Sequence, residues 1–167
     1  MNKRFSKKIT ICAVLATISL IAFTIENLLP PLFIPGARLG ISNAFILIAL
    51  LMLGKEYALT VFAVKVIFGS IFSGNVSSIL YSLPSGFIAL VLQILLLSFC
   101  NRFSAVAVSV LGGTVNVTLQ NLTFCLISGS MEYIIYLPYL ALTGAISGVL
   151  VGFIVTIIVN KLNKILE

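Results

Sequence analysis

Long apolar runs separated by short polar stretches constrain this chain more than any other feature. The longest run, residues 134–159, contains no charged side chain. Only 8% of the 167 residues are charged and 60% are hydrophobic, whereas roughly a quarter of the residues of a soluble domain carry charge. Because so few charges cannot cover a water-facing surface, we predict an all-α integral membrane protein with one transmembrane domain over residues 1–167.

Six apolar segments are predicted to form a six-transmembrane-helix bundle, and their approximate bounds are 9–29, 41–53, 57–72, 86–99, 105–127 and 134–159. The second is shorter than the roughly 20 residues that cross a bilayer. We therefore expect it to begin partly unwound or to lie beside other helices. Pro84 interrupts the pattern, and two interpretations of residues 76–86 are open, a re-entrant segment or a capping piece.

The basic start and first apolar run would also suit a signal peptide, but the run is long and no Ala-x-Ala site follows it. We therefore interpret it as the first span. Six spans place both termini on one side, together with eight of the ten basic residues: Lys3, Arg4, Lys7, Lys8, Lys55, Arg102, Lys161 and Lys164. The opposite loops hold only Arg38. Because basic residues favour the cytoplasmic side, we predict that both termini are cytoplasmic.

Two missing residue types restrict the chemistry. The chain has no His and no Asp, and its only carboxylate side chains are Glu26, Glu56, Glu132 and Glu167. A Ser-His-Asp triad, a His-based metal site and an Asp-rich magnesium–diphosphate motif are excluded, and no P-loop sequence occurs. We therefore expect no catalytic residue, metal or cofactor. The net charge of +6 follows topology, so the expected partners are membrane lipid and a small-molecule ligand rather than nucleic acid.

Lys65 lies near the middle of the third predicted span. A charge at mid-membrane costs roughly 2.5–3.5 kcal/mol on insertion scales, so it is expected to face a cavity or a partner. The alternatives are snorkelling or an ion pair with Glu26. Glu26 lies about one turn inside the outer end of the first span. It could bind a ligand, but a structural pair with Lys65 or Arg38 is the favoured single role.

The fifth span carries two amides on one face, because Asn116 and Gln120 are four residues apart. They could form the wall of a substrate pocket or hold helices together, and the sequence does not decide between these roles. Asn43 and Gln93 are single polar residues on their spans, for which helix contact is the simpler interpretation. Asn43 is nevertheless included among the substrate-binding candidates.

Residues 35–43 join a Pro-rich break to the start of the second span. Here Arg38 stands between Gly36 and Gly40, which permit unusual backbone angles and close approach. A Gly-rich turn that opens a helix presents unpaired N–H groups and the positive end of the helix dipole. This stretch is therefore expected to favour an anionic group on the outer side.

Small residues form stripes on the last and first spans. Gly144, Gly148 and Gly152 lie at four-residue spacing on one face, which is typical of close helix packing in lipid. On the first span Cys12 pairs with Ala16, and Ala13 with Thr17. This second stripe could pack internally or dock a partner helix, and both interpretations are open.

Several motifs resemble those of the bacterial Gx transporter family, also labelled heptaprenyl diphosphate synthase component I. The resemblance covers about residues 16–155. It is carried by Glu26-x-x-x-Pro30, Gly36-Ala37-Arg38-Leu39-Gly40-x-x-Asn43, Gly54-Lys55-Glu56-x-Ala58-Leu59-Thr60, Gly69-Ser70, Leu80-Tyr81-Ser82, Gly86, Ser109-Val110-x-Gly112, Gln120 and Leu137-Pro138.

That family is similar to the S components of energy-coupling-factor transporters. The resemblance implies a six-helix protein of the bacterial cytoplasmic membrane with both termini inside. It would capture a small molecule, anionic or related to a vitamin, quinone or isoprenoid, at the outer face. It would then pair with a coupling protein and two ATPase subunits. The alternative is a non-catalytic membrane subunit associated with heptaprenyl diphosphate or menaquinone synthesis, or with quinone- or flavin-linked electron transfer.

Three positions depart from the family pattern. Lys65 stands where the family usually has Arg, so the charge is kept but the bidentate fork is lost. Asn116 and Val117 stand where His-Asn is common. The first span lacks the strict Ala-x-x-x-Ala stripe through which S components often dock.

Overall fold

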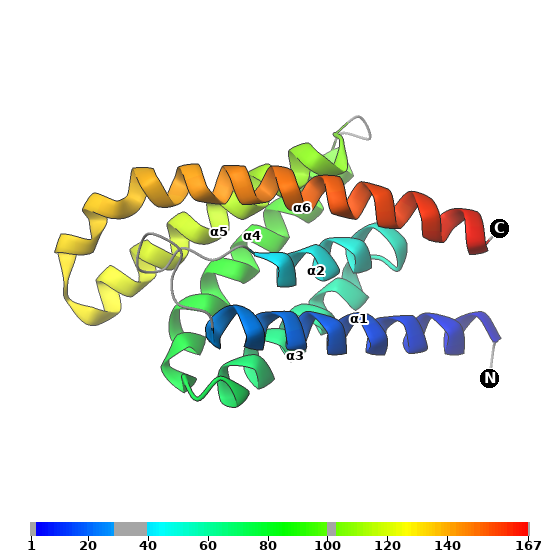
Figure 1. Ribbon diagram of the computed structural model, residues 1–167, viewed down its shortest axis with the longest axis horizontal. Helices are drawn as coiled ribbons and strands as arrows, with labels where there is room; N and C mark the ends of the chain where they lie inside the picture. The colour runs from blue at the N-terminus through cyan, green and yellow to red at the C-terminus, as the bar shows by residue number, and fades with distance from the viewer. Residues whose placement is uncertain (1–2, 29–39, 100–102, 167) are drawn as a thin grey trace.

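The computed structural model describes residues 3–28, 40–99 and 103–166, and within these ranges every regular element is a helix. In chain order the elements are α1 (Lys3–Leu28), α2 (Ile41–Met52), α3 (Lys55–Phe72), the 3-10 turn η1 (Val76–Ser78), α4 (Ile79–Phe99), α5 (Ala105–Ser128), the 3-10 segment η2 (Met131–Tyr136) and α6 (Leu137–Leu166). Figure 1 shows them as an elongated helical bundle.

Within these described ranges, four stretches are long and apolar enough to cross a membrane: Phe5–Asn27, Val76–Phe99, Ala105–Ser128 and Met131–Leu162. The other two helices differ from them in length or charge. α2 has 12 residues, and α3 carries Lys55, Glu56 and Lys65 within its 18 residues. The fold is thus an all-helical, multi-pass membrane bundle. The six crossings expected from the sequence would require α2 and α3 to cross the membrane as well.

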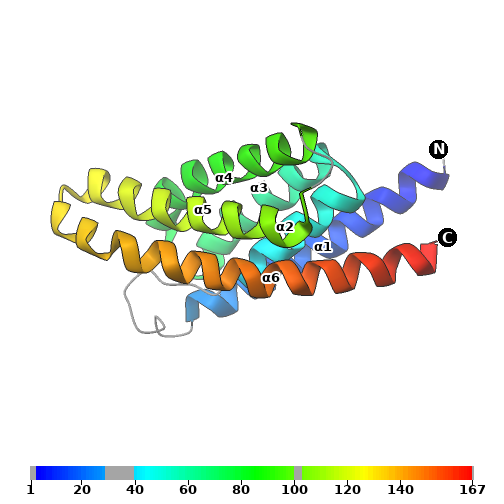
Figure 2. The same cartoon turned by 90° about the horizontal axis from the view of Figure 1, so that it is seen from above.

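The two ends of the chain lie at the same end of the bundle. In Figure 1 the start of α1 and the end of α6 are both on the right, and the turned view agrees (Figure 2). The turn between α5 and α6 lies at the opposite end in both views.

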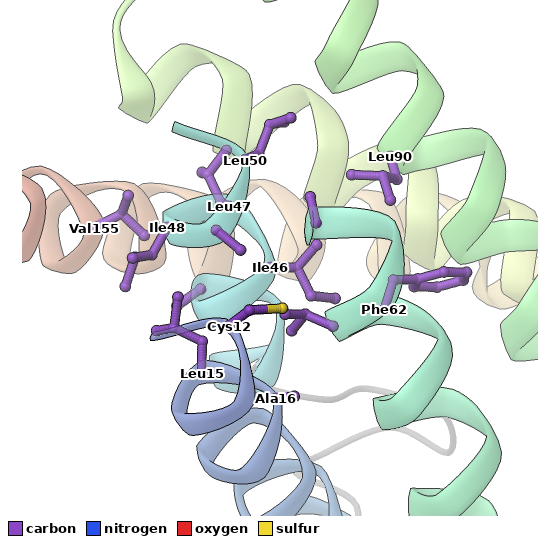
Figure 3. Close-up of a cluster of buried hydrophobic side chains, with 14 of the residues drawn as sticks. Cys12, Leu15, Ala16, Ile46, Leu47, Ile48, Leu50, Phe62, Leu90 and Val155 are labelled. Atoms are coloured by element: carbon purple, nitrogen blue, oxygen red, sulfur yellow. The ribbon is translucent and has the colours of Figure 1, made fainter. Parts of the chain in front are cut away.

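Helix α2 is the centre of the hydrophobic core. After Ser42 and Asn43 in its first turn, its sequence is apolar on all sides, which is the pattern of a helix surrounded by protein. Leu47 and Ile48 are each 1% exposed. Figure 3 shows them beside Leu15 of α1 and Val155 of α6. A helix of about 18 Å is shorter than the roughly 30 Å hydrocarbon core of a bilayer. Burial by its neighbours therefore separates this short helix from lipid.

Helices α5 and α6 pack through glycine. A Cβ atom added to Gly148 would lie 2.7 Å from Val110 Cα, and one added to Gly152 would lie 2.5 Å from Val106 Cα. Since real Cβ atoms essentially never approach this closely, only glycine allows the two backbones to come together here. Gly144 also lies against α5, where an added Cβ atom would be 3.1 Å from Gly113 O and from Thr114 Cα. The glycine face predicted on the last span thus packs against α5.

Helix α4 differs from its predicted form. It begins at Ile79 rather than Gly86 and contains Pro84 in its interior. The sequence break expected at residues 81–86 is therefore wrong, and only the turn η1 precedes the helix. Pro84 removes one backbone donor, and the Ser85 hydroxyl donates to the Tyr81 carbonyl oxygen at 2.7 Å. Hydroxyl groups of this kind support proline within a membrane helix.

Candidate functional site

A cavity lies among the helices, between the α2 core and the glycine-packed α5–α6 pair. Its volume is about 70 Å³, which is room for several water molecules or a small ligand. Its apolar walls include Phe23, Leu47, Phe62 and Val66. The polar side chains that line it are Glu26, Ser42, Asn43, Lys65, Ser82, Gln93, Ser109, Asn116, Gln120 and Ser147.

Lys65 of α3 reaches this cavity from one side. It is 5% exposed, so it does not snorkel to the membrane surface. Its Nζ donates a hydrogen bond to Asn43 Oδ1 at 2.5 Å and lies 5.4 Å from the centre of the Phe23 ring. An amide oxygen and an aromatic face both attract a cation. The local structure therefore holds the lysine charge at the cavity wall.

Asn43 occupies the first turn of α2. The helix begins after Gly40, whose φ of 66° is left-handed and therefore favours glycine. This turn is closed by the Asn43 backbone N–H, which donates to the Gly40 carbonyl oxygen at 2.9 Å. It orients the Asn43 amide toward Lys65. Asn43 joins α2 to α3 and also lines the cavity, so both interpretations made from the sequence describe its position.

Glu26 of α1 caps the beginning of α2, a role that the sequence analysis missed. The Ile41 backbone N–H donates to Glu26 Oε1 at 2.5 Å, and the Ser42 hydroxyl donates to Oε2 at 2.9 Å. A carboxylate is stabilised at a helix N-terminus by unpaired N–H groups and the helix dipole. The expectation that this helix end favours an external anion is therefore corrected: the protein's own carboxylate binds there.

The two amides of α5 both line the cavity, and their spacing correctly predicted that they share one helix face. Gln120 Nε2 donates to Ser82 Oγ of α4 at 2.7 Å, so this residue joins two helices as well as lining the cavity. Asn116 also lines it, and its side chain makes no hydrogen bond to any other described residue. Since an amide has two donors and an acceptor, Asn116 can bind a polar ligand group.

Helix α4 forms a further wall of the cavity, which was not predicted from the sequence. Ser82, Gly86, Ala89 and Gln93 all line the cavity, and their spacing places them on one helix face. Gln93 Nε2 also donates to the Val108 carbonyl oxygen of α5 at 3.5 Å, which agrees with its interpretation as a helix contact. The signal available in the sequence was the small and polar stripe on this face. The expected break at Pro84 concealed it.

Arg38 lies outside the described residues. The four proposed docking residues of α1 separate into two pairs. Cys12 and Ala16 are 6% and 7% exposed, and Figure 3 shows them in the core beside α2. Docking through this pair is therefore corrected to internal packing. Ala13 and Thr17 are exposed on the outer face of the same helix.

The side chains that line the cavity can recognise a small molecule. They comprise one lysine, the Glu26 carboxylate that caps α2, amides, hydroxyl groups and aromatic rings. Within the described ranges no cluster of three His, Cys, Asp or Glu side chains could hold a metal ion. The cavity can hold a small molecule by charge, hydrogen bonds and apolar contact.

Fold and cavity together define a helical membrane protein with a polar site between its helices. The chain belongs to the family described as heptaprenyl diphosphate synthase component I, whose family model matches residues 15–158. The family resemblance found in the sequence motifs is thereby confirmed. No curated protein and no solved structure matched the chain.

Proposed function

We propose that this protein is a membrane substrate-binding subunit that captures a small anionic molecule in the cavity beside Lys65. The observation that carries the proposal is a buried lysine at the wall of a polar cavity inside an apolar bundle. Ionisable residues inside membrane spans are costly, and they commonly mark substrate or ion sites. Glu26 caps the start of α2, and Lys65 is the cationic side chain among the residues that line the cavity.

The ligand is small or presents only a small polar group to the cavity. Lys65 and Asn43 would bind its anionic group, and Asn116 and Gln120 of α5 would bind a polar edge. Phe23 and Phe62 add apolar surface to the cavity lining. A compact acid with a flat apolar part satisfies all three environments, as would the corresponding part of a vitamin, quinone precursor or isoprenoid. Arg38, two residues before Gly40 in the sequence, is proposed to assist in binding the anionic group.

Native mass spectrometry of the purified protein tests this function. The wild-type chain is expected to carry an additional small mass that is lost in Lys65→Met, because that change removes the charge while keeping an unbranched side chain. Lys55→Met is the matched control, since Lys55 is exposed at the start of α3. An additional mass retained equally in all three proteins would contradict the proposal.

We also propose six membrane crossings with both termini in the cytoplasm of a bacterium. The common position of the two termini supports an even number of passes (Figure 1), and the basic residues near the chain ends support the orientation. Reporter domains fused to either end test this. An enzyme active only outside the membrane should be inactive at both ends, and activity at one end would overturn the topology.

The partner of a binding subunit would supply the energy for uptake. A coupling protein with two ATPases is the proposed partner, and the exposed pair Ala13 and Thr17 is the remaining docking candidate. The family description favours a second candidate, a non-catalytic membrane subunit of a prenyl diphosphate synthase. Purification from native membranes distinguishes them: co-purifying ATPases support uptake, whereas a co-purifying soluble prenyl synthase supports the second candidate.

A further inference from the structure

Three glycines outside the α5–α6 contact each receive a large side chain from a neighbouring helix. A Cβ atom added to Gly69 of α3 would lie 2.9 Å from Phe23 Cε1 of α1. One added to Gly86 of α4 would lie 2.5 Å from Phe62 Cε2 of α3. We call these two pairs and the pair described next the glycine contacts.

The third glycine contact involves a polar side chain. A Cβ atom added to Gly112 of α5 would lie 2.6 Å from Gln93 Cδ of α4. In each glycine contact the received side chain, Phe23, Phe62 or Gln93, is a wall residue of the cavity. The contacts therefore follow the chain around the cavity, from α1 to α3, from α3 to α4 and from α4 to α5.

We infer that Gly69, Gly86 and Gly112 determine the size of ligand that the cavity accepts. Each absent Cβ leaves room for a wall side chain to lie back against the neighbouring helix. A methyl group at the same position would displace that side chain, because protein interiors have no spare space of this size. The adjacent open volume is the cavity, so the displaced ring or amide would narrow it.

Gly69 has an additional positioning role. It lies four residues after Lys65 on α3, so both face the same side of the helix. Phe23 contacts Gly69 and lies beside the Lys65 ammonium group. A methyl group at Gly69 would therefore move the aromatic surface that borders the charged wall. Gly69 would therefore influence both the volume of the cavity and the surroundings of the Lys65 ammonium group.

The inference rests on the proposed function, because it assigns ligand size to the same cavity. The test uses a thiol introduced by Asn116→Cys as a reporter. The reaction rate of the protein that retains Asn116 is measured in parallel and subtracted. Purified protein is treated with methyl methanethiosulfonate and with its bulkier benzyl analogue. The ratio of the benzyl rate to the methyl rate reports the space around the cavity wall.

Gly86→Ala is expected to lower this ratio roughly tenfold, the factor that corresponds to a modest overpacking cost. Phe62→Leu alone should raise the ratio, and Gly86→Ala combined with Phe62→Leu should return it toward that of the parent. Gly69→Ala and Gly112→Ala should lower it as well. Ala63→Val, which adds volume on the exposed face of α3, is the control and should leave it unchanged.

Phe62→Leu keeps the test decisive even where a glycine variant does not fold. An unchanged ratio in Phe62→Leu, or in folded Gly86→Ala, would overturn the inference. The proposed function fails by a different result, which is equal reaction of the introduced thiol with anionic and cationic reagents of similar size. Loss of the charge preference with an intact size response would therefore contradict the proposed function alone. Loss of the size response with an intact charge preference would contradict the role of the glycines alone.

Discussion

The α2 core and the α5–α6 pair are held together in opposite ways. Around α2, large aliphatic side chains such as Leu47 and Ile48 fill the space between helices (Figure 3). Between α5 and α6, Gly148 and Gly152 bring the backbones into direct contact. Lipid provides little hydrophobic drive for helix association, so both regions depend on close packing. Large side chains provide that packing around α2, whereas missing side chains allow it between α5 and α6.

The comparison explains where the cavity lies. Its lining includes Leu47 and Val66 from the side-chain-packed core and Gly113 and Gly148 from the backbone-packed pair. Helices in direct backbone contact present small residues, which leave room for ligand on the side facing the core. The free energy of unfolding should therefore fall when atoms are removed from side chains of the α2 core. It should also fall when atoms are added between α5 and α6.

The largest expected effect is in the core. Leu47→Ala should lower the free energy of unfolding by about 3 kcal/mol, because a fully enclosed side chain leaves a void. Unfolding of the purified protein in mixed micelles with increasing denaturing detergent measures this. Leu142→Ala, at a residue 60% exposed on α6, is the control and should cost less than about 0.5 kcal/mol. Similar losses for both would remove the distinction between core and lipid-facing positions.

An addition in the helix pair should have the next largest effect. Gly148→Ala is expected to cost about 2 kcal/mol, since the new methyl group meets the backbone of α5 and not a side chain that can rotate away. The same unfolding measurement applies. Val149→Leu enlarges the neighbouring exposed residue and should be nearly neutral. If Gly148→Ala were as stable as the wild type, direct backbone contact would not hold these helices together.

The smallest expected effect is at the helix end that joins the core to the cavity. Glu26→Gln retains a carbonyl acceptor but loses the negative charge at the start of α2, and should cost about 1 kcal/mol. Glu56→Gln is a matched change in the first turn of α3. Because Glu56 is exposed, its substitution should cost less. The cap would be refuted by a larger loss in Glu56→Gln than in Glu26→Gln.

Apolar runs and charge spacing were sufficient to predict an all-helical membrane protein and the approximate position of most helices. They failed at Pro84, because a sequence break does not reveal that Ser85 can support a continuous helix. The spacing of Asn116 and Gln120 correctly placed both on one helix face. No local pattern indicated that Glu26 would cap α2, since that contact depends on how α1 and α2 meet in space.

Contacts at the cavity show the same limit. Lys65 was singled out by its depth in an apolar run, which is a property of the sequence. Its hydrogen bond to Asn43 and the placement of Phe23 on Gly69 join residues of different helices. Such pairs follow from tertiary packing, and single-helix periodicity carries no information about them.

The charge preference of the introduced thiol tests the central claim most directly. In Asn116→Cys protein, the anionic sulfonatoethyl methanethiosulfonate should react roughly tenfold faster than the cationic trimethylammonioethyl reagent, because Lys65 lines the same cavity. Each rate is first divided by that reagent's rate with a small thiol in solution. Adding Lys65→Met should abolish the preference. An equal preference with and without Lys65 would contradict an anion-binding cavity.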